Sequence, residues 1–301
     1  MRKRIFDVLR KLLYKNYHSA KIYRAYRRFL LHCSSKGKPT LVIYQMGKVG
    51  SVTVLRSLRA LELDISIYHT HGLARDNVDR LEEVYRQNFF RIGDVPEHLL
   101  HSHYLRKQID RGIRGKKWKM VTLVRDPIAR NISAFFQTLD VQLDYDYQNK
   151  IKSMGIEGVV EDLIRLFLEQ FPQHEVPLTW LDTDLKRVFG INLFSSAFPK
   201  LKGYRIYEGE HADVLLLRLE SLNECACDAF REFLNVEEFT LLEANIGSEK
   251  EYGGVYRQFL STIIVPDSYI EKMYTSQYAR HFYTEEEINM FKAKWRKEYV
   301  S

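Results

Sequence analysis

Short β-strand patterns alternate with amphipathic helix patterns along this chain of 301 residues, and this alternation limits the fold more than any other feature. Runs rich in β-branched and aromatic residues predict strands at 40–45, 65–69 and 119–124. Helical periodicity follows each run and predicts helices at 51–62, 76–88, 96–110 and from Pro127 onward. Strands that are separated by helices pair in parallel. We therefore expect an α/β fold with an open parallel sheet and helices on both faces.

The second half of the chain adds to the same sheet. The sequence predicts a strand pair, Tyr204–Glu208 and Asp213–Leu219, that turns around Gly209. Further helical patterns lie at 157–190 (two helices), 220–234 and 266–297, the last with Thr284 as an N-cap. No internal repeat divides the chain, so we interpret residues 39–301 as one α/β domain.

Residues 1–38 differ from the rest of the chain in charge. They carry a net charge of +11, against −4 for the remainder and +7 for the whole chain. A helical pattern over 2–32 has apolar side chains near one face and Lys and Arg around them, which predicts a basic amphipathic helical arm. Two interpretations are open: the arm lies on an anionic membrane surface, or it packs on the body with a solvated basic face. The acidic body disfavours a nucleic-acid partner.

Cysteine content and hydropathy restrict the location. Cys33, Cys225 and Cys227 are too few and odd in number for a disulfide framework, so we expect free thiols. No apolar run of about 18 residues predicts a transmembrane helix. Charged residues from Asp7 to Lys15 interrupt the stretch that a signal peptide would need to be apolar. We expect a cytoplasmic protein, bound to the inner membrane face if the arm binds lipid.

The segment from Tyr44 to Thr53 has the pattern of a phosphate-binding loop. A strand ends, two glycines allow a tight turn, and a helix begins near Ser51. Backbone N–H groups at such a helix start bind anions, and the helix dipole favours negative charge there. Lys48 adds a positive charge, and two hydroxyl side chains add hydrogen-bond donors. The candidate binding residues are Gly47, Lys48, Val49, Gly50, Ser51, Val52 and Thr53.

This loop is not a Walker A motif. Only Lys48 and Val49 separate its glycines, and the lysine precedes the second glycine. A loop this short is expected to bind one phosphate rather than wrap a triphosphate. The sequence therefore disfavours a P-loop kinase or NTPase.

A second candidate phosphate site follows the strand at 119–124. That strand delivers Arg125 to its carboxyl end, and Ser133 lies eight residues later in the next helix. Ligands of open parallel sheets bind beyond the carboxyl ends of the strands, so these two side chains are predicted to meet on a second phosphate. Asp126 is expected to cap the helix that Pro127 begins, and Arg130 to pair with a surface carboxylate.

These two segments together resemble the sulfotransferases that use 3′-phosphoadenosine 5′-phosphosulfate (PAPS). In that superfamily a Lys-x-Gly-Ser/Thr loop binds the 5′-phosphosulfate, and an Arg-x7-Ser element binds the 3′-phosphate. Lys48, Gly50 and Ser51 match the first motif, and Arg125 and Ser133 match the second. Over residues 40–297 the chain also resembles the bacterial NKWYS-type capsular polysaccharide synthesis proteins. The resemblance implies a P-loop-like sulfotransferase fold and a carbohydrate O-sulfotransferase that needs no metal.

The sequence departs from these families at two places. Val52 stands where a second hydroxyl residue is usual. The Asn-Lys-Trp-Tyr-Ser stretch is reduced here to Glu249–Gly253, in which Lys and Tyr remain. The resemblance makes Lys250 a candidate nucleotide contact; a solvated lysine is the alternative.

The chemistry of sulfuryl transfer requires a base for the acceptor hydroxyl and positive charge at the leaving oxygen. Lys48 is the candidate for the second role. His69 and His71 are the candidates for the first, because they lie two residues apart at a strand end and so share a face. They resemble the His-x-His pair of heparan sulfate 2-O-sulfotransferases. A second pair, His101 and His103, lies on a predicted helix and ranks lower.

The predicted reaction is transfer of a sulfuryl group from PAPS to a hydroxyl of a polysaccharide, glycolipid or other acceptor, with PAP (3′-phosphoadenosine 5′-phosphate) as the product. The main alternative is a non-catalytic protein of the same fold that binds a nucleotide or a glycan. The identity of the acceptor and the oligomeric state do not follow from the sequence.

Overall fold

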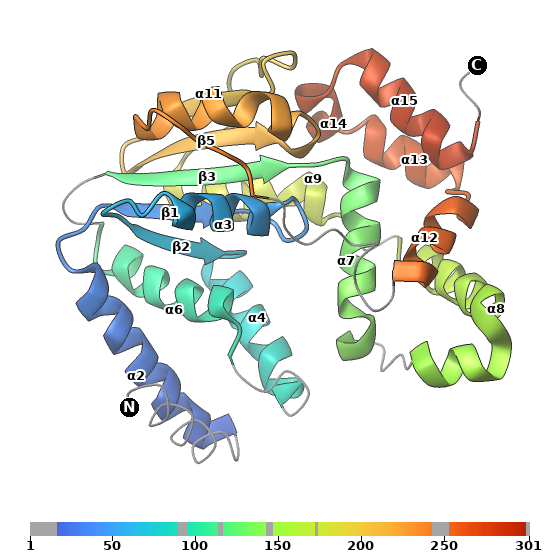
Figure 1. The fold of residues 1–301 in the computed structure, drawn as a ribbon, viewed down its shortest axis with the longest axis horizontal. Helices are drawn as coiled ribbons and strands as arrows, with labels where there is room; N and C mark the ends of the chain where they lie inside the picture. Colours follow the sequence, from blue (N-terminus) through green and yellow to red (C-terminus); the bar gives the residue numbers. More distant parts are fainter. Residues whose placement is uncertain are drawn as a thin grey trace.

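The computed structural model describes residues 17–89, 95–113, 117–142, 147–171, 174–242 and 253–298. Its centre is a five-stranded sheet with the order β2-β1-β3-β5-β4 (Figure 1). Four strands are parallel and the edge strand β4 is antiparallel to β5. The strands are β1 (Thr40–Tyr44), β2 (Ser66–Thr70), β3 (Trp118–Val124), β4 (Tyr204–Glu208) and β5 (Ala212–Arg218). The predicted mixed α/β architecture is confirmed, and each predicted strand lies within a residue or two of its expected bounds.

The strand order creates a switch point between β1 and β3. From β1 the chain moves to β2 on one side and then returns to pair β3 on the other side of β1. The connection from β1 leads to β2 on one side, whereas the connection from β3 leads to β4 on the other. Ligands of open parallel sheets bind beyond the carboxyl ends of two such strands. The predicted phosphate loop follows β1, and Arg125 follows β3. The topology therefore brings both predicted motifs to the same edge of the sheet.

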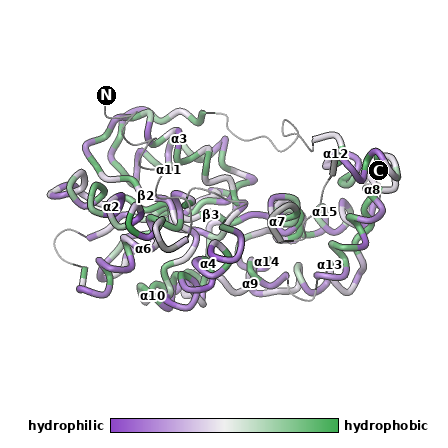
Figure 2. The backbone as a smooth tube through the Cα atoms, turned by 90° about the horizontal axis from the view of Figure 1, so that it is seen from below, coloured by the Kyte–Doolittle hydropathy of each residue, from purple (hydrophilic) through white to green (hydrophobic). Residues whose placement is uncertain are grey.

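Helices cover both faces of this sheet. Figure 2 shows α3 (Ser51–Ala60) and α11 (Leu222–Leu234) on one side, with α9 (Val176–Trp180) and α10 (Arg187–Phe189) on the other. The helices α4 (Arg75–Gln87) and α6 (Glu97–Asp110) lie beside β2. Buried strand residues such as Val42, Val121 and Leu216 are the centre of the core between these layers. The strands read as continuous apolar runs because both of their faces are covered.

A second apolar cluster lies beyond the carboxyl ends of the strands. It joins six helices through residues such as Ile132, Leu163 and Phe259, and Figure 1 shows them at the right. These helices are α7 (Pro127–Gln142), α8 (Tyr147–Glu169), α12 (Gly253–Thr262), α13 (Asp267–Tyr274), α14 (Gln277–Phe282) and α15 (Glu285–Arg296). The cluster anchors α7, the helix that carries Ser133, against the C-terminal part of the chain.

Two helical regions differ from the prediction. The region 157–190 contains the end of α8, the short α9, a π-helix at Leu181–Lys186 and α10. Helical periodicity cannot reveal this π-helix, because its 6 residues are little more than one turn. The region 266–297 contains α13, α14 (Gln277–Phe282) and α15, and Thr284 forms the predicted N-cap as part of a capping box with Glu287.

The described part of the N-terminal arm is α2 (Tyr17–Ser35), while residues 1–16 lie outside the described residues. One face of α2 packs on the body: Ala20 belongs to a cluster with Tyr85 and Leu99, and Arg24 pairs with Glu82 at 2.6 Å. Within the described ranges, no helix combines the length and the apolar character that crossing a membrane requires. All three cysteines are free thiols, as predicted.

Candidate functional site

The loop after β1 requires glycine where it enters α3. Gly50 precedes the first residue of α3 and has a φ of 88°. A Cβ atom at this position would also lie 2.5 Å from Cδ1 of Leu219. The left-handed backbone favours glycine, and a Cβ would in addition force the Leu219 side chain to move. The loop therefore approaches α3 in one conformation, with the first N–H groups of the helix facing its entry.

Lys48 adopts an unusual backbone conformation in the same loop. Its φ of 76° lies in the left-handed region, which costs a residue with a Cβ about 1–2 kcal/mol. Val49 next to it is fully buried in the main core, so any contact that Val49 makes with a ligand goes through its backbone. Ser51 is buried at the start of α3, and Val52 and Thr53 are partly buried. Strain of this kind is typical of a loop shaped for binding.

Two arginines from the β3–α7 segment donate hydrogen bonds to backbone carbonyl oxygens of this loop. Arg125 donates from Nη1 to the carbonyl oxygen of Lys48 at 3.0 Å, and Arg130 donates from Nε to that of Gly47 at 3.0 Å. The prediction that Arg130 pairs with a surface carboxylate is wrong. It contacts the phosphate loop instead, because the first turns of α7 run past that loop at the switch point.

The described residues supply no carboxylate partner for either of these arginines. Among the described residues, neither Arg125 nor Arg130 lies within 4.0 Å of a carboxylate oxygen. The pKa of Arg130 is lowered to about 10, mainly by burial and to a smaller extent by the neighbouring Arg125. Two cations that are this close, partly desolvated and unpaired are costly unless an anion joins them. An arrangement of this kind favours the binding of an anion.

The backbone of Arg125 and Asp126 is fixed from the C-terminal half of the chain. The hydroxyl of Tyr278 donates to the carbonyl oxygen of Arg125 at 2.9 Å, and Glu220 accepts from the Asp126 N–H at 2.7 Å. Asp126 caps α7 as predicted, with Oδ1 accepting from the Ile128 N–H at 3.0 Å, and its side chain also accepts from Tyr274. These contacts hold Arg125 at the edge of the sheet.

Ser133 lies in α7 and is partly exposed. Among the contacts of the described residues, Arg125 bonds to the loop rather than to Ser133. Their predicted meeting on a second phosphate is therefore not a direct contact and stays a prediction. Lys250 lies outside the described residues.

His71 faces the phosphate loop with one ring nitrogen. Its Nδ1 lies 3.1 Å from the carbonyl oxygen of Gln45, and because a carbonyl only accepts, Nδ1 carries the proton. Nε2 then has the free lone pair. That atom lies 3.9 Å from where a Cβ on Gly47 would be, so it points at the loop. Burial lowers the pKa of His71 well below 6.5, which keeps the ring neutral near pH 7.

His69 lies deeper than His71. It is 8% exposed, its ring centroid is 4.7 Å from that of His71, and its Nε2 has no hydrogen-bond partner among the described residues. His98 of α6 also contacts His71, with ring centroids 4.8 Å apart. The sequence analysis did not single out this histidine. The structure thus brings the predicted pair together and adds a third ring. Of the three, His71 is the one next to the loop.

The second His-x-His pair is divided between two structural contacts. His101 accepts a hydrogen bond at Nδ1 from the His69 N–H at 3.0 Å. His103 donates from Nε2 to Glu82 at 2.8 Å. Both contacts join elements around β2, which supports their lower rank. In the described parts of the chain no three His, Cys, Asp or Glu side chains are grouped as metal ligands.

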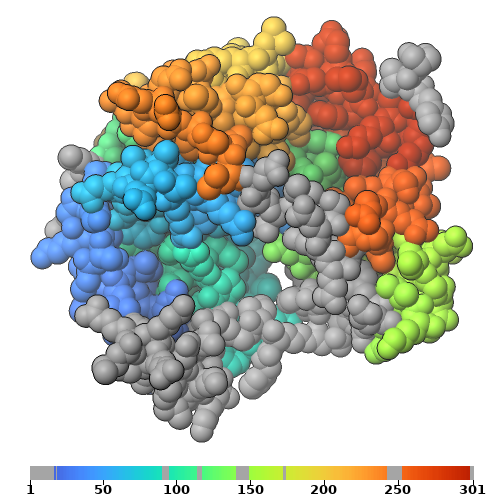
Figure 3. Space-filling model, viewed as in Figure 1, coloured from blue at the N-terminus to red at the C-terminus, as the bar shows by residue number. Residues whose placement is uncertain are grey.

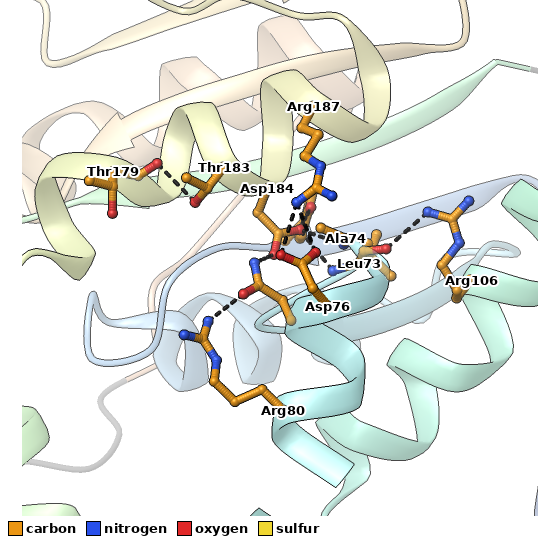
Figure 4. A network of polar contacts seen from close by, with 11 residues as sticks. Leu73, Ala74, Asp76, Arg80, Arg106, Thr179, Thr183, Asp184 and Arg187 are labelled. Atoms are coloured by element: carbon orange, nitrogen blue, oxygen red, sulfur yellow. Dashed lines mark hydrogen bonds and ion pairs between the residues drawn. The ribbon is translucent and has the colours of Figure 1, made fainter. Parts of the chain in front are cut away.

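A buried carboxylate holds the turn that follows His71. Figure 4 shows Asp184 of the π-helix pointing into the turn between β2 and α4. Its Oδ1 accepts from the N–H groups of Leu73 at 2.8 Å and Ala74 at 3.0 Å, and from the hydroxyl of Tyr44. Trp180 donates from Nε1 to the carbonyl oxygen of His71 at 2.9 Å. The 180–184 segment therefore fixes the backbone of His71 and of the turn that follows it.

Sequence reasoning missed Arg130, His98, Trp180 and Asp184 as parts of the site. One pattern could have revealed the last: Asp184 stands directly before Leu185 on the apolar face of its helix, where a carboxylate needs a partner. The contacts of Arg130 and His98 depend on strand order, so no local sequence pattern indicates them.

The buried histidines predict acid-sensitive folding. The pKa values of His69, His98 and His174 are lowered to about 4, mainly by burial, whereas an unfolded histidine titrates near about 6.5. Below pH 6.5 the unfolded chain binds more protons than the folded one. Stability is therefore full above pH 6.5 and falls as the pH drops toward 4, by up to about 1.4 kcal/mol per pH unit for each histidine.

Urea denaturation at pH 7.5 and 5.0 measures this effect, with a lower unfolding free energy expected at pH 5.0. The His98→Gln variant is expected to show a shallower pH dependence over this range. Equal stability of the wild type at the two pH values would show that these rings are hydrated and titrate normally.

Comparison with known proteins gives one match. The family model described as "putative capsular polysaccharide synthesis protein" (NKWYS) matches residues 160–284. No curated protein and no solved structure matches the chain. The match covers part of the predicted 40–297 resemblance, and it includes neither the loop after β1 nor Arg125.

The matched region nevertheless contains the residues that hold these motifs. Trp180 and Asp184 fix the turn after His71, while Glu220 and Tyr278 fix the backbone of Arg125 and Asp126. The matched region thus supplies the side chains that position the backbone of the candidate site.

Proposed function

We propose that this protein is a PAPS-dependent O-sulfotransferase that acts on a carbohydrate or glycolipid hydroxyl. The observation that carries the proposal is the pair of arginines, Arg125 and Arg130, that converge on the loop before α3. Within the described ranges, neither of them has a carboxylate partner. A helix start, a strained lysine and two guanidinium groups favour a ligand with several negative charges. A nucleotide with a 3′-phosphate and a 5′-phosphosulfate fits this demand.

The residues have separate roles in this proposal. PAPS, when bound, supplies an activated sulfuryl group. The backbone N–H groups at the start of α3 and the charge of Lys48 stabilise negative charge that grows on the leaving phosphate oxygen. Nε2 of His71 takes the proton of the acceptor hydroxyl as the new oxygen–sulfur bond forms. The bound anions favour the protonated imidazole, so they raise the pKa of His71 from its low value in the free protein.

The acceptor class rests on the family match. The name of the matching family suggests a role in polysaccharide biosynthesis. A polysaccharide has many sugar hydroxyl groups that could accept a sulfuryl group. The proposed acceptor is therefore a hydroxyl of a capsular or related polysaccharide or of its lipid-linked precursor.

Calorimetry with PAP tests the nucleotide site. We expect the wild type to bind PAP at micromolar concentrations and ATP·Mg²⁺ more weakly, because ATP lacks the 3′-phosphate. Removing one charge-assisted contact costs about 1.5–3 kcal/mol, so Arg125→Ala should weaken PAP binding by about tenfold to 100-fold. Lys48→Ala and Arg130→Ala should also weaken it.

The matched control is Arg56→Ala, which removes an exposed arginine from α3 and should leave PAP binding unchanged. A folded wild type that binds no PAP would contradict the proposal and favour a glycan-binding protein. Tighter binding of ATP·Mg²⁺ than of PAP would favour a kinase.

A further inference from the structure

The helix α2 has two faces with opposite roles. The inner face packs on the body through Ala20 and Tyr23, which are at most 5% exposed, and through Arg24 in its ion pair with Glu82. The outer face exposes large apolar side chains: Ile22 is 64% exposed and Phe29 is 59% exposed. Packing on the body therefore does not account for the amphipathic pattern of this helix.

The exposed apolar side chains form one stripe. Ile22, Tyr26, Phe29 and Leu30 are spaced by four, three and one residues, which places them on one side of a helix. Leu30 also lines, with Leu31, Leu100 and Arg27, a recess of about 510 Å³ between α2 and α6. Glu97 and His101 line the same recess, so the stripe ends at a surface of mixed polarity there. Other exposed large apolar residues of the described chain, such as Leu201 and Met290, are scattered over distant elements.

The segment that carries the stripe is basic. From Tyr17 to Lys38 the chain has six Lys or Arg and no Asp or Glu. Arg24 and Lys38 pair with Glu82 and Asp64 of the body. Lys21 and Lys36, by contrast, are exposed on the helix and just after it. An apolar stripe with basic flanks is complementary to a surface that is apolar inside and anionic outside.

We propose that the outer face of α2 docks on an anionic lipid bilayer, with Ile22, Tyr26, Phe29 and Leu30 inserted and the flanking lysines and arginines at the headgroups.

A second copy of the chain fits this face less well. A two-fold contact would place the basic flanks of one α2 against those of the other, and like charges repel. Figures 1 and 2 place α2 at the end of the molecule opposite the C-terminal helices, and Figure 3 shows it at the surface.

Vesicle co-sedimentation of the full chain tests this proposal. The vesicles contain phosphatidylcholine alone or phosphatidylcholine with phosphatidylglycerol. We expect binding to the anionic vesicles, at least tenfold weaker binding to the neutral ones, and a loss of binding as salt rises. The double variant Ile22→Glu/Phe29→Glu should bind anionic vesicles at least tenfold more weakly than the wild type.

The matched control is Ile264→Glu/Met290→Glu, which changes two apolar residues of similar exposure, 64% and 55%, elsewhere on the surface. It should bind like the wild type, and circular dichroism verifies that both double variants are folded. Three outcomes overturn the proposal. They are a folded wild type that does not bind anionic vesicles, wild-type binding that is equal for neutral and anionic vesicles, or binding of Ile22→Glu/Phe29→Glu that equals that of the wild type. Sedimentation velocity identifies the second-copy alternative, in which this variant abolishes a dimer.

Discussion

We expect the His71→Ala variant to lose about 10²–10⁴-fold in the rate of sulfuryl transfer while it binds PAP as the wild type does. The reason is the position of Nε2, which has a free lone pair and faces Gly47 of the loop. The imidazole is neutral before the proton transfer, so its removal takes no positive charge from the nucleotide site. The substitution should therefore slow the reaction far more than it weakens nucleotide binding. The measurement is the release of PAP from PAPS with a polysaccharide acceptor that the wild type uses.

The two histidines of the predicted pair are distinguished by the same assay. His69→Gln should retain much more activity than His71→Ala, since His69 lies behind His71 and is almost fully buried. His103→Ala is the matched control, because it removes a partly buried histidine that contacts Glu82 instead of the site. If His69→Gln lost the activity and His71→Ala kept it, the assignment of the base to His71 would be wrong.

The Asp184→Ala variant should lose about 3–5 kcal/mol of unfolding free energy, a large part of the stability of a typical domain. Removal of this carboxylate leaves the buried N–H groups of Leu73 and Ala74, and the hydroxyl of Tyr44, without their acceptor. Each such donor costs about 1–3 kcal/mol when it is buried without a partner. Because the turn after His71 is then released, the transfer rate should fall as well.

Urea denaturation measures this loss, and Asp182→Ala is its matched control. Asp182 lies in the same π-helix but pairs with Lys186 at 3.3 Å on the surface, where such pairs contribute about 0–1 kcal/mol. Equal destabilisation by the two substitutions would mean that Asp184 contributes only through helix formation. Asp184→Asn, which keeps the shape and one acceptor oxygen, should fall between the wild type and Asp184→Ala.

Some features of this chain follow from short segments alone. The strands, the loop from Gly47 to Ser51 and the cap at Asp126 are visible in the sequence, because β-branched runs, glycine positions and capping residues act over a few residues. The free cysteines and the two-residue spacing of His69 and His71 are equally local. The match over 160–284 agrees with the predicted relation to capsular polysaccharide synthesis proteins for that region.

Other features needed the folded chain. Three contacts of the site join residues that lie 27 to 111 positions apart. They are the contact of Arg130 with Gly47, that of His98 with His71, and that of Asp184 with the turn after His71. For α2, the sequence left two interpretations open, and the structure shows that one face packs while the other is exposed.

The sequence by itself determined which segments form strands and helices and which residues have the chemistry to bind phosphate and accept a proton. Only the tertiary structure decided that β3 pairs with β1, so that Arg125 and Arg130 reach the loop, and that Nδ1 of His71 bonds to Gln45, so that Nε2 faces Gly47. The physical reason is that strand order and hydrogen-bond partners depend on the packing of distant segments, whereas turn geometry and periodicity depend on neighbours in the chain.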